Sequence, residues 1–214
     1  MYEVDIIFFD LDGTLIDSRI DIVNAVNFTL RRNKLGEKGI DEISSYIGTG
    51  VGDLIKKSLG EKNGPLFEKS LSVFEGYYKD HAFDNTRLYE GVREILEHFG
   101  KKRKIVVTNK KYFFAHESLK RLKIDTYFEA VYGGDNVGCL KPSSCTLEKA
   151  MDIYKGDRTK CIMVGDMVVD VLAGKRARMM TCAVTYGIGK RNDIEKAGPD
   201  YIIDKISELK NIIE

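Results

Sequence analysis

The sequence predicts an α/β fold in which a core domain with a parallel β-sheet carries an inserted helical domain. Over most of the chain, short apolar runs rich in β-branched and aromatic residues alternate with helical patterns, as in parallel α/β sheets. One long stretch, residues 16–87, breaks this alternation and shows helical patterns alone. A length of 214 residues and a hydrophobic fraction of 43% suit one globular core with a modest insertion.

The expected strands are short apolar segments that end at polar or turn-forming residues. The first, Val4–Phe9, stops abruptly at Asp10 and is typical of a buried central strand. Later strands are expected at Lys104–Val107, Phe128–Tyr132, Cys161–Val164 and Met180–Val184. Helical patterns lie between them, at Lys111–Leu122, Ser143–Tyr154 and Val168–Ala177. Because strand and helix alternate, we expect the strands to run parallel and to form a Rossmann-like core.

The insertion begins just after the first strand and its turn. Its periodic segments all indicate helices, at Ile20–Arg32, Asp41–Tyr46, Asp53–Leu59 and Leu66–His81. An insertion at this point should lie over the carboxyl end of the sheet, which is where open α/β sheets bind their ligands. The sequence therefore predicts a core domain of residues 1–15 and 88–214 and a helical domain of residues 16–87.

Charge and composition argue against nucleic-acid and membrane binding. The formal net charge is +1, with basic and acidic residues intermixed, so no broad positive field is expected. The densest basic run, Lys101–Lys104, precedes an apolar strand and is better explained as a solvated turn. The first residues include acids at Glu3 and Asp5 and no long apolar stretch, so we expect neither a signal peptide nor a membrane span.

The cysteines give a prediction about cellular location. The chain has four cysteines, at Cys139, Cys145, Cys161 and Cys182. They form no CxxC pair, and no histidine lies at zinc-ligand spacing from them. We therefore expect free thiols rather than disulfides or a zinc site. Free thiols indicate a reducing compartment, and a cytoplasmic protein is expected.

Four acids follow two of the expected strands. Asp10 and Asp12 come at the end of the first strand, and Asp166 and Asp170 come just after Cys161–Val164. If these strands are neighbours, the four carboxylates converge at one edge of the sheet, and that much like charge requires a cation. An all-oxygen ligand set without histidine suits Mg²⁺. The alternative is that each aspartate only caps a turn or a helix.

The motifs in which these acids lie resemble those of the haloacid dehalogenase superfamily, in the branch that holds phosphoglycolate phosphatases. Asp10-Leu-Asp-Gly-Thr-Leu resembles the first motif of the family, and Val106–Lys110 resembles the second. Leu140–Pro142 resembles the third motif, and Gly165–Asp170 resembles the fourth. The four segments follow one another along the chain in the order that the family has. The resemblance covers nearly the whole chain, because the helical insertion is similar to the cap domain of this branch.

The resemblance implies a Mg²⁺-dependent phosphatase. Its nucleophile would be Asp10, and Asp12 would be general acid and then general base, with its backbone carbonyl on the metal. The resemblance assigns phosphate binding to Thr108, Asn109 and Lys141, and metal binding to Asp10, Asp12, Asp166 and Asp170. Charge arguments agree with these roles. A carboxylate that approaches a phosphate dianion is repelled by roughly 4 kcal/mol per charge pair at about 4 Å and an effective dielectric constant of about 20. Positive groups must therefore surround Asp10.

A glycine-rich loop in the insertion is a further candidate site. The run Gly48-Thr49-Gly50-Val51-Gly52 precedes the helix expected from Asp53, and backbone amides at a helix N-terminus can hold an anion. That anion would be the carboxylate of phosphoglycolate, which is the expected substrate. A simple interhelical turn explains the glycines equally well. Asp53 would compete for the amides, and Lys56 would offset it.

Other functions remain open at this point. A phosphomutase of the β-phosphoglucomutase type would use the same two acids, and a nucleotide or pyrophosphate phosphatase would differ only in its substrate. A non-catalytic binding protein would not need the full set of motifs. The three histidines and the tyrosines Tyr77 and Tyr78 share no spacing, so we expect no catalytic role for them. The predicted partner is a small phosphorylated metabolite, with no nucleic acid and no membrane.

Overall fold

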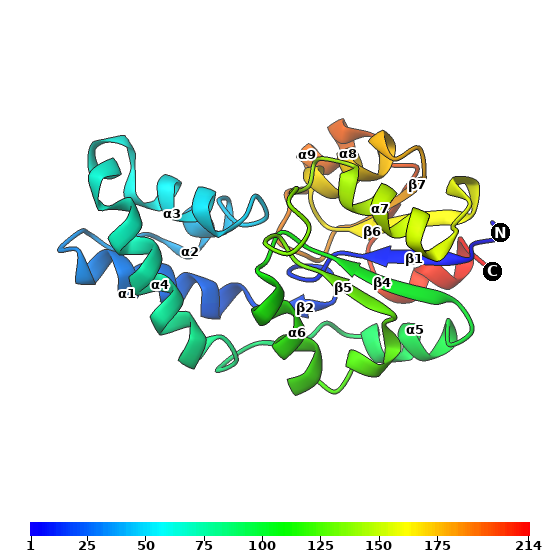
Figure 1. Ribbon diagram of the computed structural model, residues 1–214, viewed down its shortest axis with the longest axis horizontal. Helices are drawn as coiled ribbons and strands as arrows, with labels where there is room; N and C mark the ends of the chain where they lie inside the picture. The colour runs from blue at the N-terminus through cyan, green and yellow to red at the C-terminus, as the bar shows by residue number, and fades with distance from the viewer.

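The computed structural model describes all 214 residues. Its core is a six-stranded sheet of the order β5-β4-β1-β6-β7-β8, with parallel pairing throughout. The strands are β1 (Ile6–Phe9), β4 (Arg103–Val107), β5 (Ala130–Tyr132), β6 (Cys161–Gly165), β7 (Met180–Val184) and β8 (Tyr201–Ile203). Figure 1 shows this sheet with helices on both faces and a group of helices to one side. The predicted α/β, Rossmann-like fold is confirmed.

Strand β1 is buried on both faces. Ile7 and Phe9 pack in one cluster with residues of α5 (Val92–His98) and α6 (Tyr112–Arg121). Ile6 and Phe8 point to the other face and pack in a second cluster with α7 (Cys145–Tyr154) and α8 (Val168–Arg176). Every position of this strand is therefore apolar, and the first polar residue, Asp10, directly follows it.

The order in which strands are added to the sheet reverses between β1 and β6. From β1 the chain goes to β4 and β5 on one side and then crosses to β6 on the other. Phe9 pairs with Val164, and the backbone N–H of Asp10 donates to the carbonyl of Val164 over 2.9 Å. The residues that follow these two strands therefore lie side by side at the point where α/β sheets of this kind bind ligands.

The segment 19–81 is helical, as predicted. It contains α1 (Arg19–Arg32), α2 (Ile40–Ser44), α3 (Val51–Leu59) and α4 (Phe67–His81). Two short antiparallel strands, β2 (Ile16–Asp17) and β3 (Arg87–Leu88), form the connections between these helices and the core. The helices share a hydrophobic cluster of their own, which Phe114 of α6 joins from the core. The division into residues 1–15 with 88–214 and residues 16–87 stays a prediction, and this separate cluster is its physical basis.

Short elements escaped the sequence analysis. Strand β8, the β2–β3 pair, α5 and α9 (Arg191–Ala197) were not predicted. Each spans only two to seven residues, which is too short for a clear hydrophobic period, and pairing with a neighbour defines the strands. None of the helices combines the length and the apolar character that a membrane-spanning helix requires.

Candidate active site

Three buried carboxylates meet at the carboxyl ends of β1 and β6. They belong to Asp10, Asp166 and Asp170, and one oxygen from each lies within 4.8 Å of the other two. Asp10 directly follows β1, Asp166 directly follows β6, and Asp170 lies in the first turn of α8. The sheet register brings them together, because it sets the ends of β1 and β6 side by side.

The cluster holds more negative charge than its surroundings neutralise. Burial raises the pKa of Asp10, Lys141 opposes this effect, and Asp170 adds to it, so the net shift is upward. Burial also raises the pKa of Asp166, and both neighbouring carboxylates reinforce that shift. Hydrogen bonds compensate Asp166 only in part: Thr14 Oγ1 donates to it over 3.0 Å and the backbone N–H of Ile188 over 2.7 Å. A divalent cation would remove this imbalance.

The backbone around the cluster leaves no room for additional side chains. Gly13 adopts a φ of 91°, and a Cβ at this position would overlap the carboxylate of Asp166. Gly187 also lies against this carboxylate, and a Cβ there would overlap it as well. Glycine is therefore required at both positions, and the chain closes tightly around the oxygen atoms. The all-oxygen donor set fits a hard cation.

Lys141 is the cation of the cluster. Its side chain is 2% exposed, and its Nζ donates to Asp10 Oδ1 over 2.6 Å and to the carbonyl of Val107 over 2.7 Å. The same Nζ lies 2.7 Å from Asp170 Oδ1. Burial lowers the pKa of Lys141, but Asp10 and Asp170 outweigh it, so the net shift is upward and the ammonium stays charged.

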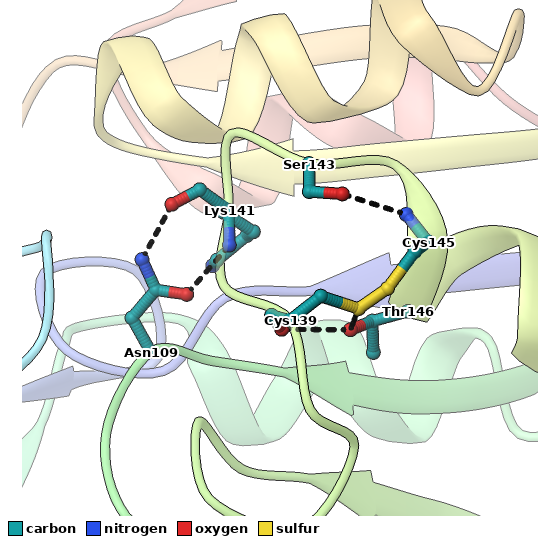
Figure 2. The surroundings of a disulfide bond; sticks show 6 residues. All are labelled: Asn109, Cys139, Lys141, Ser143, Cys145 and Thr146. Atoms are coloured by element: carbon teal, nitrogen blue, oxygen red, sulfur yellow. Dashed lines mark hydrogen bonds between the residues drawn. A yellow bond between two sulfur atoms is a disulfide. The ribbon is translucent and has the colours of Figure 1, made fainter.

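Asn109 holds the backbone of Lys141 in place. Figure 2 shows the two hydrogen bonds between these residues: Asn109 Nδ2 donates to the Lys141 carbonyl over 2.9 Å, and the Lys141 N–H donates to Asn109 Oδ1 over 2.8 Å. Asn109 Nδ2 also donates to the carbonyl of Gly48 over 2.7 Å. The amide therefore links the lysine loop to the glycine-rich loop between α2 and α3. Its predicted role in phosphate binding stays a prediction.

Asp12 does not belong to the group of three clustered carboxylates. Its Oδ1 accepts a hydrogen bond from Ser18 Oγ over 2.5 Å and one from Lys110 Nζ over 2.9 Å. These two donors hold the Asp12 carboxylate, and Asp12 lines the same cavity as Asp10. If Asp12 takes part in metal binding, its backbone carbonyl is the group that remains for it, as the resemblance implies.

A cavity separates the carboxylate cluster from the helices. Asp10, Asp12, Thr108 and Asn109 line it from the core. From the helical side, its walls include the loop residues Gly48 and Gly50 and the side chains of Leu54, Phe74 and Tyr78. Of the other loop residues, Thr49 lines a neighbouring hollow and hydrogen bonds with Asp53, and Gly52 faces Phe67. Anion binding by this loop stays a prediction.

A disulfide joins Cys139 and Cys145 on either side of Lys141 (Figure 2). Their Cα atoms are 6.5 Å apart, within the range of protein disulfides. The expectation of free thiols is wrong for this pair, whereas Cys161 and Cys182 are free and buried. The loop folds back onto α7, where Thr146 Oγ1 donates to the carbonyl of Cys139 over 3.2 Å. The cysteines therefore no longer support a reducing compartment.

Comparison with known proteins agrees with this geometry. A family model described as haloacid dehalogenase-like hydrolase matches residues 7–184, which include all four predicted motifs. The chain belongs to the haloacid dehalogenase-like hydrolases. The predicted resemblance is therefore confirmed, and the chain is a phosphatase, a phosphoric monoester hydrolase.

Relatives in this family match over nearly their whole length. Two proteins named phosphoglycolate phosphatase, from Nitrosococcus oceani and Aquifex aeolicus, are 32% and 34% identical to the chain. Each alignment covers 98% of this chain and 96% of the relative. A crystal structure described as a predicted phosphoglycolate phosphatase from Haemophilus somnus superposes with a TM-score of 0.93 at 26% identity and covers 99% of both chains.

Sequence reasoning missed several groups at the site. Lys110 pairs with Asp12 across 98 positions of sequence, and its Nζ donates to Tyr78 OH over 2.8 Å. The expectation that Tyr78 has no catalytic role stays a prediction, but this residue lines the cavity. The hydroxyl group of Ser18 donates to Asp12, and that of Thr14 donates to Asp166. The available signal was the position of Lys110 next to Asn109 in the second motif.

Proposed function

We propose that the chain is a Mg²⁺-dependent phosphatase of small phosphate monoesters, with phosphoglycolate as its preferred substrate and an aspartyl-phosphate on Asp10 as its intermediate. The observation that carries the proposal is the buried group in which Lys141 contacts both Asp10 and Asp170 beside Asp166. The names of the relatives support phosphoglycolate as the substrate.

The metal would be held by the carboxylates of Asp10, Asp166 and Asp170, with the backbone carbonyl of Asp12 as a further ligand. The raised pKa values of Asp10 and Asp166 support this assignment, because they reflect like charge that a cation would neutralise. When bound, Mg²⁺ would reduce the repulsion between the nucleophile and the phosphate and would orient the phosphate oxygens.

Asp10 is the nucleophile in this proposal. Its Oδ1 is held by Lys141, and its side chain lines the cavity where a phosphate would enter. Lys141 offsets the charge of the incoming phosphate, and the Thr108 hydroxyl donates a hydrogen bond to it. Asn109 orients Lys141 through the two backbone hydrogen bonds described above. Attack on phosphorus forms the Asp10–phosphate bond and breaks the bond to the ester oxygen.

Asp12 performs the proton transfers. In its protonated form it gives a proton to the departing alkoxide, and in its ionised form it then removes a proton from the water that attacks the intermediate. Ser18 and Lys110 fix its orientation, since both donate to Oδ1. The helical segment 16–87 acts as a cap that excludes bulk water, which the apolar residues Leu54 and Phe74 in the cavity wall support.

A panel of phosphate esters tests the proposal. Phosphate release is measured for phosphoglycolate, a hexose phosphate, a nucleotide, pyrophosphate and p-nitrophenyl phosphate, with Mg²⁺ and with EDTA. The proposal predicts the highest kcat/KM for phosphoglycolate, loss of release in EDTA and recovery when Mg²⁺ is added. Isomerisation of a sugar phosphate without net phosphate release would instead indicate a phosphomutase, and release that persists in EDTA would contradict the metal requirement.

A further inference from the structure

Lys110 is a buried cation for which the proposed phosphate chemistry has no direct use. It follows Asn109 after β4, and its side chain is 7% exposed. Its Nζ donates to Asp12 Oδ1 over 2.9 Å and to the phenol oxygen of Tyr78 over 2.8 Å. Burial lowers the pKa of Lys110, but Asp12 and Tyr78 together outweigh this effect, so the net shift is upward. A permanent positive charge therefore lines the cavity.

Two unused donors lie together at this point. An ammonium group has three protons, and the structure supplies two acceptors for that of Lys110. Tyr78 accepts a hydrogen bond from Lys110, while its own O–H proton has no acceptor. Burial raises the pKa of Tyr78 to about 12, so the phenol is neutral at pH 7 and retains this proton. One N–H of Lys110 and the O–H of Tyr78 are thus free to bind an anion.

The other lysines of the site are already engaged. Lys111 forms an ion pair of 2.5 Å with Glu75 of α4. Lys141 is shared between two carboxylates, Asp10 and Asp170. Lys110 could be shared in the same way, with Asp12 on one side and a ligand on the other. The apolar walls nearby, such as Phe74, would make an unpaired anion costly there, so a ligand anion needs this cation.

The chemistry of the substrate places an anion within reach of Lys110. The proposed function, on which this inference rests, brings the ester oxygen to Asp12 for protonation. In phosphoglycolate the carboxyl carbon is two bonds from that oxygen, and Lys110 contacts the same Asp12. We infer that Lys110 and Tyr78 bind the carboxylate of the substrate, and that they select phosphate esters whose alcohol carries a carboxylate on the neighbouring carbon.

A pair of substrates isolates this interaction. Phosphoglycolate and 2-hydroxyethyl phosphate have nearly the same size, but only the first has the carboxylate. Because Lys110 also orients Asp12, its removal impairs proton transfer to both substrates, and that loss cancels in the ratio of their kcat/KM values. A hydrogen bond to a charged group corresponds to a selectivity of about 10- to 100-fold. We expect the wild-type ratio in this range and a ratio close to one for Lys110→Met.

Matched variants complete the test. Lys111→Met removes the adjacent lysine, which pairs with Glu75, and should keep the wild-type ratio. Lys110→Arg keeps the charge and should retain part of the selectivity. Tyr78→Phe removes a single hydroxyl group and should lower the ratio severalfold. This variant decides the question if Lys110→Met does not fold.

Three results would overturn the inference. The first is equal kcat/KM values for the two substrates with the wild-type enzyme. The second is an unchanged ratio in Lys110→Met or, if that variant does not fold, in Tyr78→Phe. The third is Mg²⁺-dependent hydrolysis of other esters without turnover of phosphoglycolate. All three results leave Mg²⁺-dependent phosphatase activity standing, although the third also excludes phosphoglycolate as the substrate. Failure to hydrolyse any ester in the panel would refute both the activity and the inference.

Discussion

Replacement of Asp166 by asparagine removes one negative charge from the carboxylate cluster and keeps the shape of the side chain. At a separation of 4.8 Å, two unit charges repel each other by roughly 3.5 kcal/mol when the effective dielectric constant is about 20. Asp166 has two such neighbours, and Lys141 contacts those neighbours rather than Asp166 itself. The substitution weakens charge-assisted hydrogen bonds from Thr14 and Ile188, at about 1 kcal/mol each. The metal-free variant should therefore be as stable as the wild type, or more stable.

The response to Mg²⁺ should change in the opposite direction. A ligand at about 100 times its Kd stabilises a folded protein by about 2.7 kcal/mol, which raises the Tm of a chain of this size by about 5–11 °C. Asp166→Asn lacks a proposed ligand, so we expect this rise to shrink below about 2 °C at the same Mg²⁺ concentration. Thermal unfolding followed by circular dichroism, with EDTA and with Mg²⁺, measures both effects.

An exposed residue provides the control for this experiment. Asp152 lies on the surface of α7, and Asp152→Asn changes the net charge equally without affecting the cluster. It should keep the full Mg²⁺ response. The reasoning is refuted if Asp166→Asn shows the same Mg²⁺ response as the wild type. A loss of more than about 3 kcal/mol in the metal-free variant would refute the argument from repulsion.

Four further variants test separate parts of the account. Asp10→Asn should lower turnover by at least about 10³-fold, and activity near the wild-type level would exclude Asp10 as nucleophile. Asp12→Ala should slow alkyl esters by about 10²- to 10⁴-fold but p-nitrophenyl phosphate much less, and equal losses would argue against an acid role. The double variant Cys139→Ser/Cys145→Ser should lose about 2 kcal/mol of stability, measured by urea unfolding; an unchanged midpoint would show that the disulfide does not stabilise the fold. Asp21→Ala should cost about 2–4 kcal/mol, because Asp21 accepts hydrogen bonds from the backbone N–H groups of Asn85 and Thr86; a cost below about 1 kcal/mol would contradict this.

The sequence predicted the parts of the site that depend on strand ends. Asp10 and Asp166 follow strands whose apolar runs are easy to recognise, and pairing of β1 with β6 brings their carboxylates together. Lys141 was found through its motif. Its contact with Asp170 follows from the start of α8, which the sequence also predicted.

Contacts between the two parts of the chain could not be predicted. Tyr78 lies on a helix with aromatic residues on several sides, and the sequence does not tell which of them faces Lys110. The sequence analysis gave Lys110 no role of its own, although it ends the second motif. Its role depends on how α4 sits over the sheet, and local patterns contain no information on that packing. The Cys139–Cys145 pair was missed for a similar reason, since only the fold of the loop brings the two residues together.

Chemical trapping of the intermediate tests the central claim, that Asp10 receives the phosphoryl group. The enzyme is mixed with phosphoglycolate and Mg²⁺ and quenched in acid within one turnover. Borohydride then reduces any acyl phosphate to an alcohol, and peptide mass spectrometry locates the altered residue. The account predicts conversion of Asp10 to homoserine, which requires both substrate and Mg²⁺ and is absent in Asp10→Asn. Substrate-dependent conversion of a different carboxylate, with Asp10 intact, would contradict it.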